Sequence, residues 1–152
     1  MTQNEMEHLL KEFIEERMMK MVGTINADLD YSFVDCDVKE GSLRLRFPLK
    51  AWQMNPKGHL HGGMVCTILD TSMGCLAYAM SGGYHTPTVD MSTSFIASSN
   101  EGEHLIVEVA LQHGGSRIMK VEAKAICEER KVLVASSMGT YIVNNRKANA
   151  HV

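Results

Sequence analysis

The sequence predicts an α+β domain in which an antiparallel six-stranded sheet wraps around one long central helix, with an extra helix at the N-terminus. Six segments alternate apolar and polar residues with the two-residue period of a half-buried strand, whereas only two segments have helical periodicity. Two helices are too few to cover both faces of a parallel sheet, so the antiparallel arrangement fits better. The uncovered flank of such a sheet calls for a second copy of the chain.

The composition indicates one compact domain over residues 1–152. Of these 152 residues, 45% are hydrophobic, which is ordinary for a globular protein with a sizeable core. The net charge of −3 gives no reason to expect nucleic acid as a partner. No stretch approaches the roughly 18 apolar residues of a membrane span. The N-terminus lacks the basic-then-apolar order of a signal peptide, so we expect a cytoplasmic protein without a membrane partner.

The N-terminal segment, residues 1–23, is predicted to be an amphipathic helix. Its apolar residues recur at helical spacing between positions 5 and 22, and its outer face is mainly acidic. Thr2 and Glu5 stand in the positions of a capping box, and Gly23 is a typical stop. This pattern favours a surface helix packed on the main body.

Two strands are predicted next, over residues 31–38 and 42–49. The second is the stronger, because apolar residues alternate there with two arginines. Glu40 and Gly41 are predicted to form the hairpin turn between the two strands.

Residues 55–80 are the segment around which the rest of the chain is organised. A glycine-broken loop ends in Gly62 and Gly63, and a helix over residues 64–80 follows that is apolar on nearly all sides. The first N–H groups of a helix lack intrahelical partners and carry partial positive charge. The bare backbone at the two glycines therefore predicts a site for an oxygen atom that carries or develops negative charge.

Asp70 is the single charge on this helix, and it shares a stripe of small and polar residues with Thr67, Thr71 and Gly74. Periodicity alone is equally consistent with a solvent-facing residue and with a functional carboxylate. The residues from Gly63 to Asp70 span ~10 Å along the helix axis, too far for both groups to serve one reaction within one chain. If they act together, Asp70 must come from a second, antiparallel copy, whose close approach the small residues of the stripe would permit.

The second half of the chain contains four predicted strands. They cover residues 88–97, 105–113, 117–127 and 132–143. A tight turn at residues 113–116 joins the second of these strands to the third. The tail, residues 144–152, is polar and is expected to be mobile.

The loop and the central helix contain the pattern N-P-x-G-x-x-H-G-G-x6-D, occupied by Asn55, Pro56, Gly58, His61, Gly62, Gly63 and Asp70. This pattern resembles the signature of the hotdog-fold acyl-CoA thioesterases of the phenylacetyl-CoA (PaaI-like) branch. The strand that begins Thr88-Val89-Asp90-Met91 resembles a strand of the same branch. The resemblance covers residues 31–143 and implies a hotdog fold and acyl-CoA thioesterase activity.

The resemblance also implies roles for individual residues. The backbone N–H of Gly62 is expected to polarise the thioester carbonyl, with Asn55 holding that carbonyl or the attacking water. Asp70 is expected to act as general base or nucleophile, with the Thr88 hydroxyl assisting the water. The remaining site residues are expected to be His61 in catalysis and, in substrate binding, Gly63, Thr71, Phe95, His113, Gly114, Gly115, Ser116, Arg117 and Ile118.

Several of these residues have plainer interpretations. For His61 we favour hydrogen bonds that shape the turn over acid or base catalysis. Asn55 could cap the approach to the helix, and Thr88 could serve only as a β-former. The pair His59 and His61 has no third ligand at metal spacing, and the cysteines stand singly, so we expect no metal. No cofactor is expected either, because CoA would enter only as part of the substrate.

The expected assembly is a homodimer at least, with a dimer of dimers, a homotetramer, favoured. Two functions other than thioester hydrolysis stay open: a non-catalytic acyl-CoA-binding or regulatory module on the same scaffold, and a hotdog-fold hydratase. A binding module needs no carboxylate in an apolar helix, and the His and Asp motif of the hydratases is not found here. Hydrolysis of an acyl-CoA is therefore the favoured function, with aromatic, medium-chain and long-chain acyl groups all open.

Overall fold

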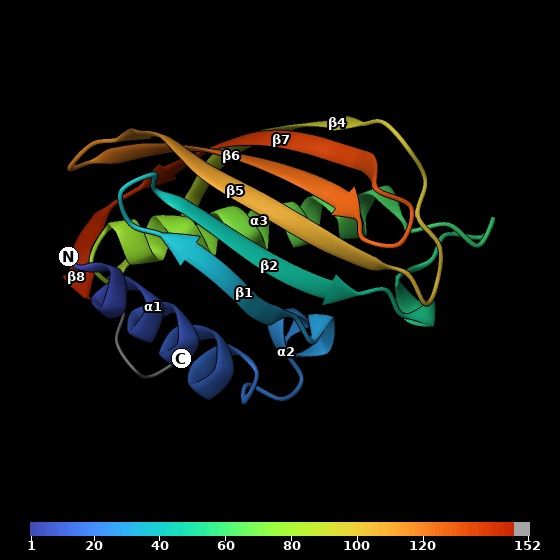
Figure 1. The fold of residues 1–152 in the computed structure, drawn as a ribbon, viewed down its shortest axis with the longest axis horizontal. Helices are drawn as coiled ribbons and strands as arrows, with labels where there is room; N and C mark the ends of the chain where they lie inside the picture. Colours follow the sequence, from blue (N-terminus) through green and yellow to red (C-terminus); the bar gives the residue numbers. More distant parts are fainter. Residues whose placement is uncertain (148–152) are drawn as a thin grey trace.

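The structure, a computed structural model, describes residues 1–147 and confirms the predicted α+β architecture (Figure 1). A six-stranded antiparallel sheet curves around one long helix, α3 (Gly62–Met80), and its strand order is β1-β2-β5-β6-β7-β4. The strands are β1 (Ser32–Asp37), β2 (Ser42–Pro48), β4 (Thr88–Phe95), β5 (His104–Gly114), β6 (Ile118–Cys127) and β7 (Val132–Ile142).

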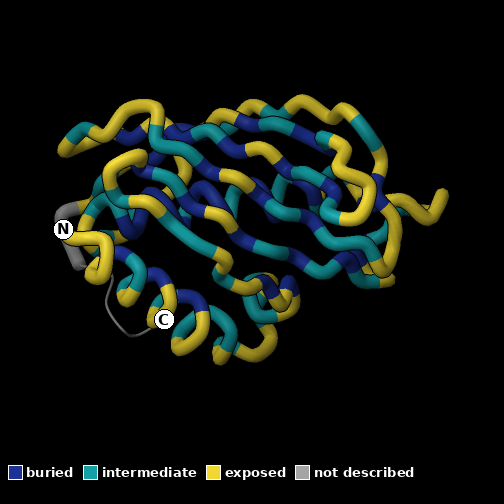
Figure 2. Tube along the Cα trace, viewed as in Figure 1, coloured by how far each residue is buried: buried dark blue, intermediate teal, exposed yellow. Residues whose placement is uncertain are grey.

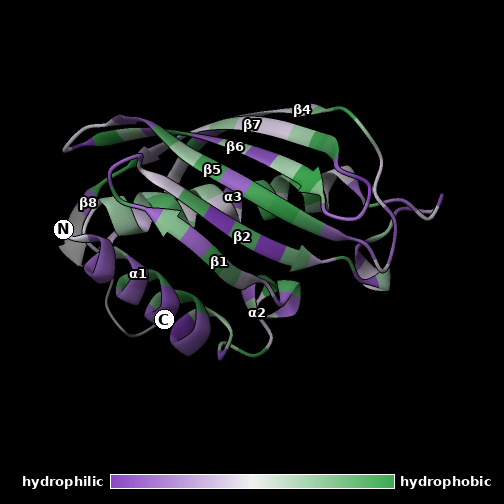
Figure 3. Cartoon of the chain, in the orientation of Figure 1, coloured by the Kyte–Doolittle hydropathy of each residue, from purple (hydrophilic) through white to green (hydrophobic). Residues whose placement is uncertain are grey.

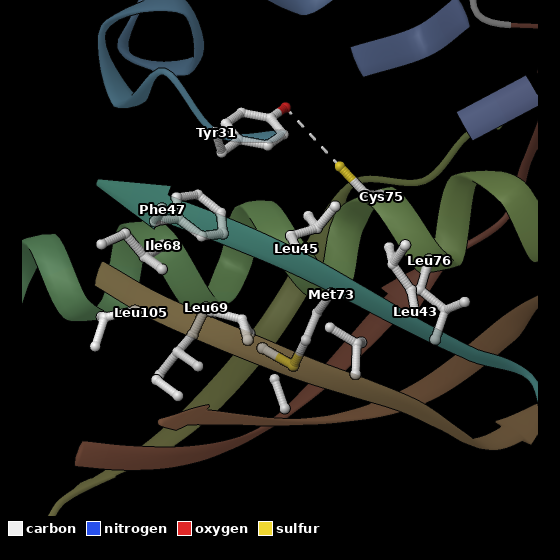
Figure 4. Packing of buried hydrophobic residues seen from close by; sticks show 14 of the residues in the cluster. Tyr31, Leu43, Leu45, Phe47, Ile68, Leu69, Met73, Cys75, Leu76 and Leu105 are labelled. Carbon is white, nitrogen blue, oxygen red and sulfur yellow. Dashed lines mark hydrogen bonds between the residues drawn. The ribbon is translucent and has the colours of Figure 1, made fainter. Parts of the chain in front are cut away.

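The inner face of the sheet packs on α3, and the two together form the core. Alternate residues of β2 are buried, and Figure 3 shows the matching bands of hydrophobic and hydrophilic residues along the strands. Figure 2 shows the same alternation in burial. The core side chains drawn in Figure 4 include Leu43, Leu45 and Phe47 of β2 and Ile68, Leu69, Met73 and Leu76 of α3, all of them almost completely buried.

The expectation that no segment has the character of a membrane span was wrong for α3. This helix has 19 residues, and an 18-residue window of it reaches a mean hydropathy of 1.3, enough by length and composition for a span. The sheet wraps around it, however, and 56% of that window is buried inside the fold. Packing against the sheet accounts for its apolar surface, as in the core helix of a globular domain.

The N-terminal helix begins as predicted, at α1 (Gln3–Lys11). The Thr2 hydroxyl accepts a hydrogen bond from the Glu5 N–H, and the Glu5 carboxylate accepts one from the Thr2 N–H, which completes the capping box. Beyond Lys11 the chain continues as a π-helix, Glu12–Met18, and does not reach the predicted stop at Gly23. The wider turns of this π-helix were not predicted, because helical spacing of apolar residues does not distinguish α from π geometry over two turns.

Four short elements were also missed, one of them the 3₁₀-helix Ala51–Gln53. Helix α2 (Ile25–Leu29) is capped by Thr24, whose hydroxyl accepts from the Ala27 N–H. Strands β3 (Tyr84–His85) and β8 (Asn144–Lys147) pair in a separate two-stranded sheet. Residues 144–147 of the predicted tail thus form a strand, although this polar segment lacks hydrophobic alternation, and the expected mobility of the tail stays a prediction. The tail's last five residues, 148–152, lie outside the described part of the chain.

Strand β4 forms one edge of the main sheet and pairs with β7. Three large apolar side chains on or beside it are more than half exposed: Val89 at 53%, Phe95 at 59% and Ile96 at 55%. An edge strand with exposed apolar side chains offers a surface on which another chain can associate. The expected homodimer remains a prediction, and this edge is where the fold leaves room for it.

Candidate active site

Helix α3 begins at Gly62, with His61 as its N-cap residue. The His61 imidazole Nδ1 accepts a hydrogen bond from the Gly63 N–H at 2.9 Å, and the His61 carbonyl accepts from the N–H groups of Met64 and Val65. Within the described residues, the Gly62 N–H has no such partner. It is therefore the donor of the first turn left for a ligand at the positive end of the helix dipole.

This arrangement separates the predicted roles of the two glycines and the histidine. His61 caps the helix, which is the turn-shaping role favoured above. Gly63 was expected to bind substrate, but its N–H donates to His61 Nδ1 and is therefore not available to a ligand. Gly62 keeps its N–H, and a Cβ built on it would meet the Phe95 ring at 3.5 Å, so the ring of β4 lies directly beside this donor.

Asn55 lies in the loop before α3 and is oriented by the backbone of its own turn. Its Oδ1 accepts from the N–H groups of Lys57 at 2.9 Å and His59 at 3.2 Å. Two backbone donors on one oxygen fix which end of the amide is oxygen and which is nitrogen. The Asn55 amide thus caps the turn, as its plainer interpretation held, and also leaves its Nδ2 donors available for a ligand.

Asp70, two turns along α3, is held at one carboxylate oxygen. Its Oδ1 accepts from the Thr88 hydroxyl at 2.8 Å and from the Tyr141 hydroxyl at 2.9 Å. No hydrogen bond reaches Oδ2 from the described part of the chain. Burial, reinforced by the neighbouring Asp70 charge, raises the pKa of Tyr141, so its hydroxyl stays protonated and donates throughout the ordinary pH range. The carboxylate is therefore oriented by two hydroxyls with one oxygen left for chemistry.

A β-bulge brings Thr88 to Asp70. The register of β4 against β7 shifts between Thr88 and Asp90, so Thr88 lies opposite Tyr141 while Met91 lies opposite Gly139. If side chains simply alternated along β4, Thr88 and Met91 would lie on opposite faces of the sheet. The extra residue of the bulge places both on the inner face, which is the common effect of a bulge on side-chain direction.

Tyr141 was missed by the sequence-based prediction, because a tyrosine in a strand is ordinarily a β-former. The signal that could have indicated it is Gly139, a glycine inside a strand, since such a residue often marks a close approach. A Cβ at position 139 would lie 2.8 Å from the Tyr141 ring and 3.1 Å from the end of Met73, so only glycine fits. The space it leaves lets the fully buried Tyr141 ring lie flat and reach α3.

Four of the five predicted catalytic residues line two pockets that share no lining residue, whereas His61 lines neither. The first, here named the Asp70 cavity, has a volume of about 240 Å³ and contains Asp70, Thr71, Gly74, Tyr78, Thr88 and Tyr141 in its lining. The second, here named the Gly62 pocket, has a volume of about 370 Å³ and contains Asn55, Leu60, Gly62, Val65, Phe95 and Ile96. Two turns of α3 separate them, as the ~10 Å rise along the helix requires.

The other predicted binding residues are divided between these pockets and the far end of the sheet. Thr71 lines the Asp70 cavity and Phe95 the Gly62 pocket, whereas the hairpin turn of residues 113–118 lines neither. The hairpin forms as predicted, with the Gly115 N–H donating to the Ile118 carbonyl, and most of it is exposed. Its expected contact with the nucleotide part of CoA stays a prediction.

Groups that could bind a metal are engaged elsewhere. His59 contacts the Asn100 side chain and His61 caps α3, so the two histidines of the H-x-H pair do not act together. One cluster of ligand-type side chains among the described residues joins His104, Glu128 and Glu129 at the start of β5. Partial burial disfavours the Glu129 charge, but hydrogen bonds from His104 outweigh it and hold the pKa of Glu129 at about 2, and Glu128 pairs with Arg46.

Residues 57–134 match the sequence model of the Thioesterase superfamily, which includes the start of α3, Asp70 and Thr88. The chain belongs to the thioesterase superfamily. An esterase candidate from Thermoplasma acidophilum is 27% identical to this chain over 118 residues. The match covers 78% of this chain and 85% of the relative.

Two solved structures share the hotdog fold with this member of the superfamily. The PaaI protein from the phenylacetic acid degradation operon of E. coli superposes with a TM-score of 0.79 at 15% identity, covering 93% of this chain and 98% of that one. A Streptococcus mutans protein bound to acetyl-CoA superposes with a TM-score of 0.69 at 20% identity, covering 77% and 90% of the two chains. At these identities the likeness establishes the fold, and the residues that act remain to be argued from the site.

Proposed function

We propose that the protein is an acyl-CoA thioesterase that hydrolyses an acyl-CoA thioester to free CoA and a carboxylic acid. One observation carries the proposal: a single helix holds at its start an N–H donor with no partner among residues 1–147, and an oriented carboxylate two turns later, each in its own pocket. Donors for a developing oxyanion and a carboxylate for water are what thioester hydrolysis needs. The superposition on a protein that binds acetyl-CoA supports the choice of a CoA thioester.

The active site is formed by two copies of the chain. In one copy the Gly62 N–H and the Asp70 carboxylate are too far apart to act on the same carbonyl. Two α3 helices side by side in opposite directions would bring the Gly62 pocket of one copy against the Asp70 cavity of the other. Phe95 and Ile96, two exposed apolar residues at the β4 edge, line the pocket of Gly62 and would be covered in such a homodimer.

The reaction uses each of these groups in turn. The Gly62 N–H and the Asn55 Nδ2 hold the thioester oxygen and stabilise it as negative charge develops during attack. Asp70 Oδ2 takes a proton from the attacking water, while Thr88 and Tyr141 hold the other oxygen of the carboxylate. Collapse of the tetrahedral intermediate breaks the carbon–sulfur bond, and the leaving thiolate takes up the proton. Direct attack by Asp70 on the carbonyl is the alternative for the first step.

A panel of acyl-CoA substrates, assayed for release of free thiol, tests the proposal. Asp70→Asn is the matched variant, because the amide keeps an oxygen for Thr88 and Tyr141 and loses only the basic carboxylate. We expect thiol release from the wild type, and a turnover about 10²–10⁴ times lower in the variant with the same fold by circular dichroism. Binding of acyl-CoA without thiol release would instead indicate a binding module, and addition of water to an enoyl-CoA would indicate a hydratase.

A further inference from the structure

We infer that the N-terminal helix supplies the acyl-group site, with Phe13 and Met18 selecting an uncharged acyl group of about six to ten carbon atoms. The inference rests on the proposed thioesterase function and adds to it a specificity site. Both side chains line the Asp70 cavity, although they come from a segment far from Asp70 in sequence. The motif in residues 55–70 does not include either of them.

The π-helix is what places these two side chains together. Phe13 and Met18 are five residues apart, which in an α-helix would direct them about 140° away from each other. The segment Glu12–Met18 instead has i→i+5 geometry, with the Met19 N–H donating to the Ile14 carbonyl at 3.0 Å. In that geometry residues five apart lie on one face, and π-helical turns occur often at functional sites.

Phe13 and Met18 form one side of the Asp70 cavity, and contacts between the N-terminal helix and α3 hold this side in place. The Phe13 ring stacks on the Tyr78 ring, with centroids 4.1 Å apart and an angle of 22° between the planes. Arg17 Nη1 donates to the Tyr78 hydroxyl at 3.1 Å, and its guanidinium lies 5.4 Å from the centre of the Phe13 ring. Ile14, next to Phe13, is fully buried in the core. The N-terminal helix is thus fixed in position before a ligand arrives, as suits a specificity pocket.

The chemistry of the lining defines the class of acyl group. Asp70 is the one carboxylate among the described residues that line the cavity, and a second carboxylate on the acyl group would be repelled by it. The hydroxyl of Tyr31 is directed at the Cys75 sulfur at 3.9 Å (Figure 4), so both polar atoms face each other. Burial raises the pKa of Cys75 to about 12, which keeps its thiol neutral. The lining also contains Asn26, His85 and three threonines, but its aromatic and sulfur-containing part accepts an uncharged apolar group.

The size and shape of the Asp70 cavity determine the length of the acyl group that it can hold. A cavity of 150 Å³ accommodates benzene, and the volume here is about 240 Å³, which corresponds to roughly six to ten carbon atoms on the same scale. Gly74 contributes no side chain, and a Cβ there would touch only Tyr141, at 3.9 Å. Tyr31, Cys75, Tyr78 and Tyr141 of the lining are buried, so this part of the cavity suits the apolar end of the acyl group. The long polar CoA portion must leave toward solvent.

The test compares kcat/KM for acetyl-CoA, octanoyl-CoA and palmitoyl-CoA in the wild type, Phe13→Ala, Met18→Ala and Met19→Ala. Met19 is the matched control, because it neighbours Met18 and packs on the core without lining the cavity. We expect the wild type to prefer octanoyl-CoA, and each of the two cavity variants to lower the octanoyl to acetyl ratio by at least about tenfold. Met19→Ala should keep the wild-type ratio. Phe13→Leu, which keeps an apolar side chain, covers the case in which Phe13→Ala fails to fold.

The outcomes separate this inference from the proposed function. A wild type that hydrolyses none of the three thioesters overturns the thioesterase proposal and the acyl site with it. A wild type that hydrolyses them, with the same chain-length ratios in Met18→Ala, Phe13→Leu and Met19→Ala, overturns the acyl site alone. A preference for acetyl-CoA or palmitoyl-CoA in the wild type would contradict the assigned length.

Discussion

The Tyr141 hydroxyl lies 2.9 Å from Asp70 Oδ1, so a fully buried phenol from β7 orients the one charge on α3. Thr88 donates to the same oxygen from β4. Two donors on one oxygen restrain the carboxylate and leave Oδ2 without a hydrogen bond from residues 1–147. The pair also couples the sheet to the helix at the point where the reaction is proposed to occur.

Tyr141→Phe removes the donor and keeps the ring. We expect kcat to fall by roughly tenfold to a hundredfold, because a hydrogen bond to a charged group contributes about 1.5–3 kcal/mol. Tyr84→Phe, the same change outside the site, is the control. A kcat that stays at the wild-type value in Tyr141→Phe would show that Tyr141 only fills space.

Gly62→Pro tests the oxyanion donor with little change in the helix. Gly62 is the first residue of α3, where proline is well tolerated, and His61 has the extended backbone, with φ −64° and ψ 136°, that precedes proline readily. The substitution deletes the N–H, and we expect kcat to fall by about 10²–10³. Gly62→Ala keeps the N–H and serves as the comparison. Equal activity of the two variants would remove Gly62 from the mechanism.

Mixing two inactive variants tests the two-chain site. Asp70→Asn damages one half-site, and Asn55→Asp damages the other while keeping the oxygen that caps the turn. A mixed dimer has one site with both defects and one site with neither. After subunit exchange we expect about a quarter of wild-type activity, since half of the dimers at random pairing carry one intact site of two. Activity that stays at the level of the separate variants would place both groups in one chain.

His61→Ala and His61→Asn distinguish a cap from an acid or base. The alanine variant loses the acceptor for the Gly63 N–H, and we expect it to be destabilised by about 0.5–2 kcal/mol in urea unfolding. Asparagine is a good N-cap residue and should restore most of that stability, and activity along with it. If His61→Asn is stable and yet inactive, the imidazole has a chemical role beyond the cap.

The sequence was sufficient for the architecture because its signals are periodic. Alternation predicted the six strands of the main sheet, and the apolar segment after Gly62 and Gly63 predicted α3. The short elements were missed for the opposite reason: β3 has two residues and β8 is polar, so neither carries a pattern. Pairing between them is decided by where the end of α3 and the end of β7 place the backbone.

The candidate site was predictable only as far as the resemblance in residues 55–70 and 88–91 reaches. Asn55, Gly62 and Asp70 lie in one contiguous pattern, whereas Thr88 depends on a bulge and Tyr141 on the space left by Gly139. Phe13 and Met18 depend on a change from α to π geometry. These are tertiary features that single-residue periodicity does not encode. Gly139, a glycine inside a strand, was the one local sequence feature that indicated any of these tertiary contacts.

The separation of Gly62 and Asp70 along one rigid helix affects how the activity of the enzyme must be measured. If neither copy can turn over substrate by itself, specific activity should fall on dilution as the chains separate, even though each remains folded. A rate constant measured at nanomolar protein would then report self-association as much as chemistry. Kinetic comparisons among variants should accordingly be made at several enzyme concentrations, with ratios taken on the plateau.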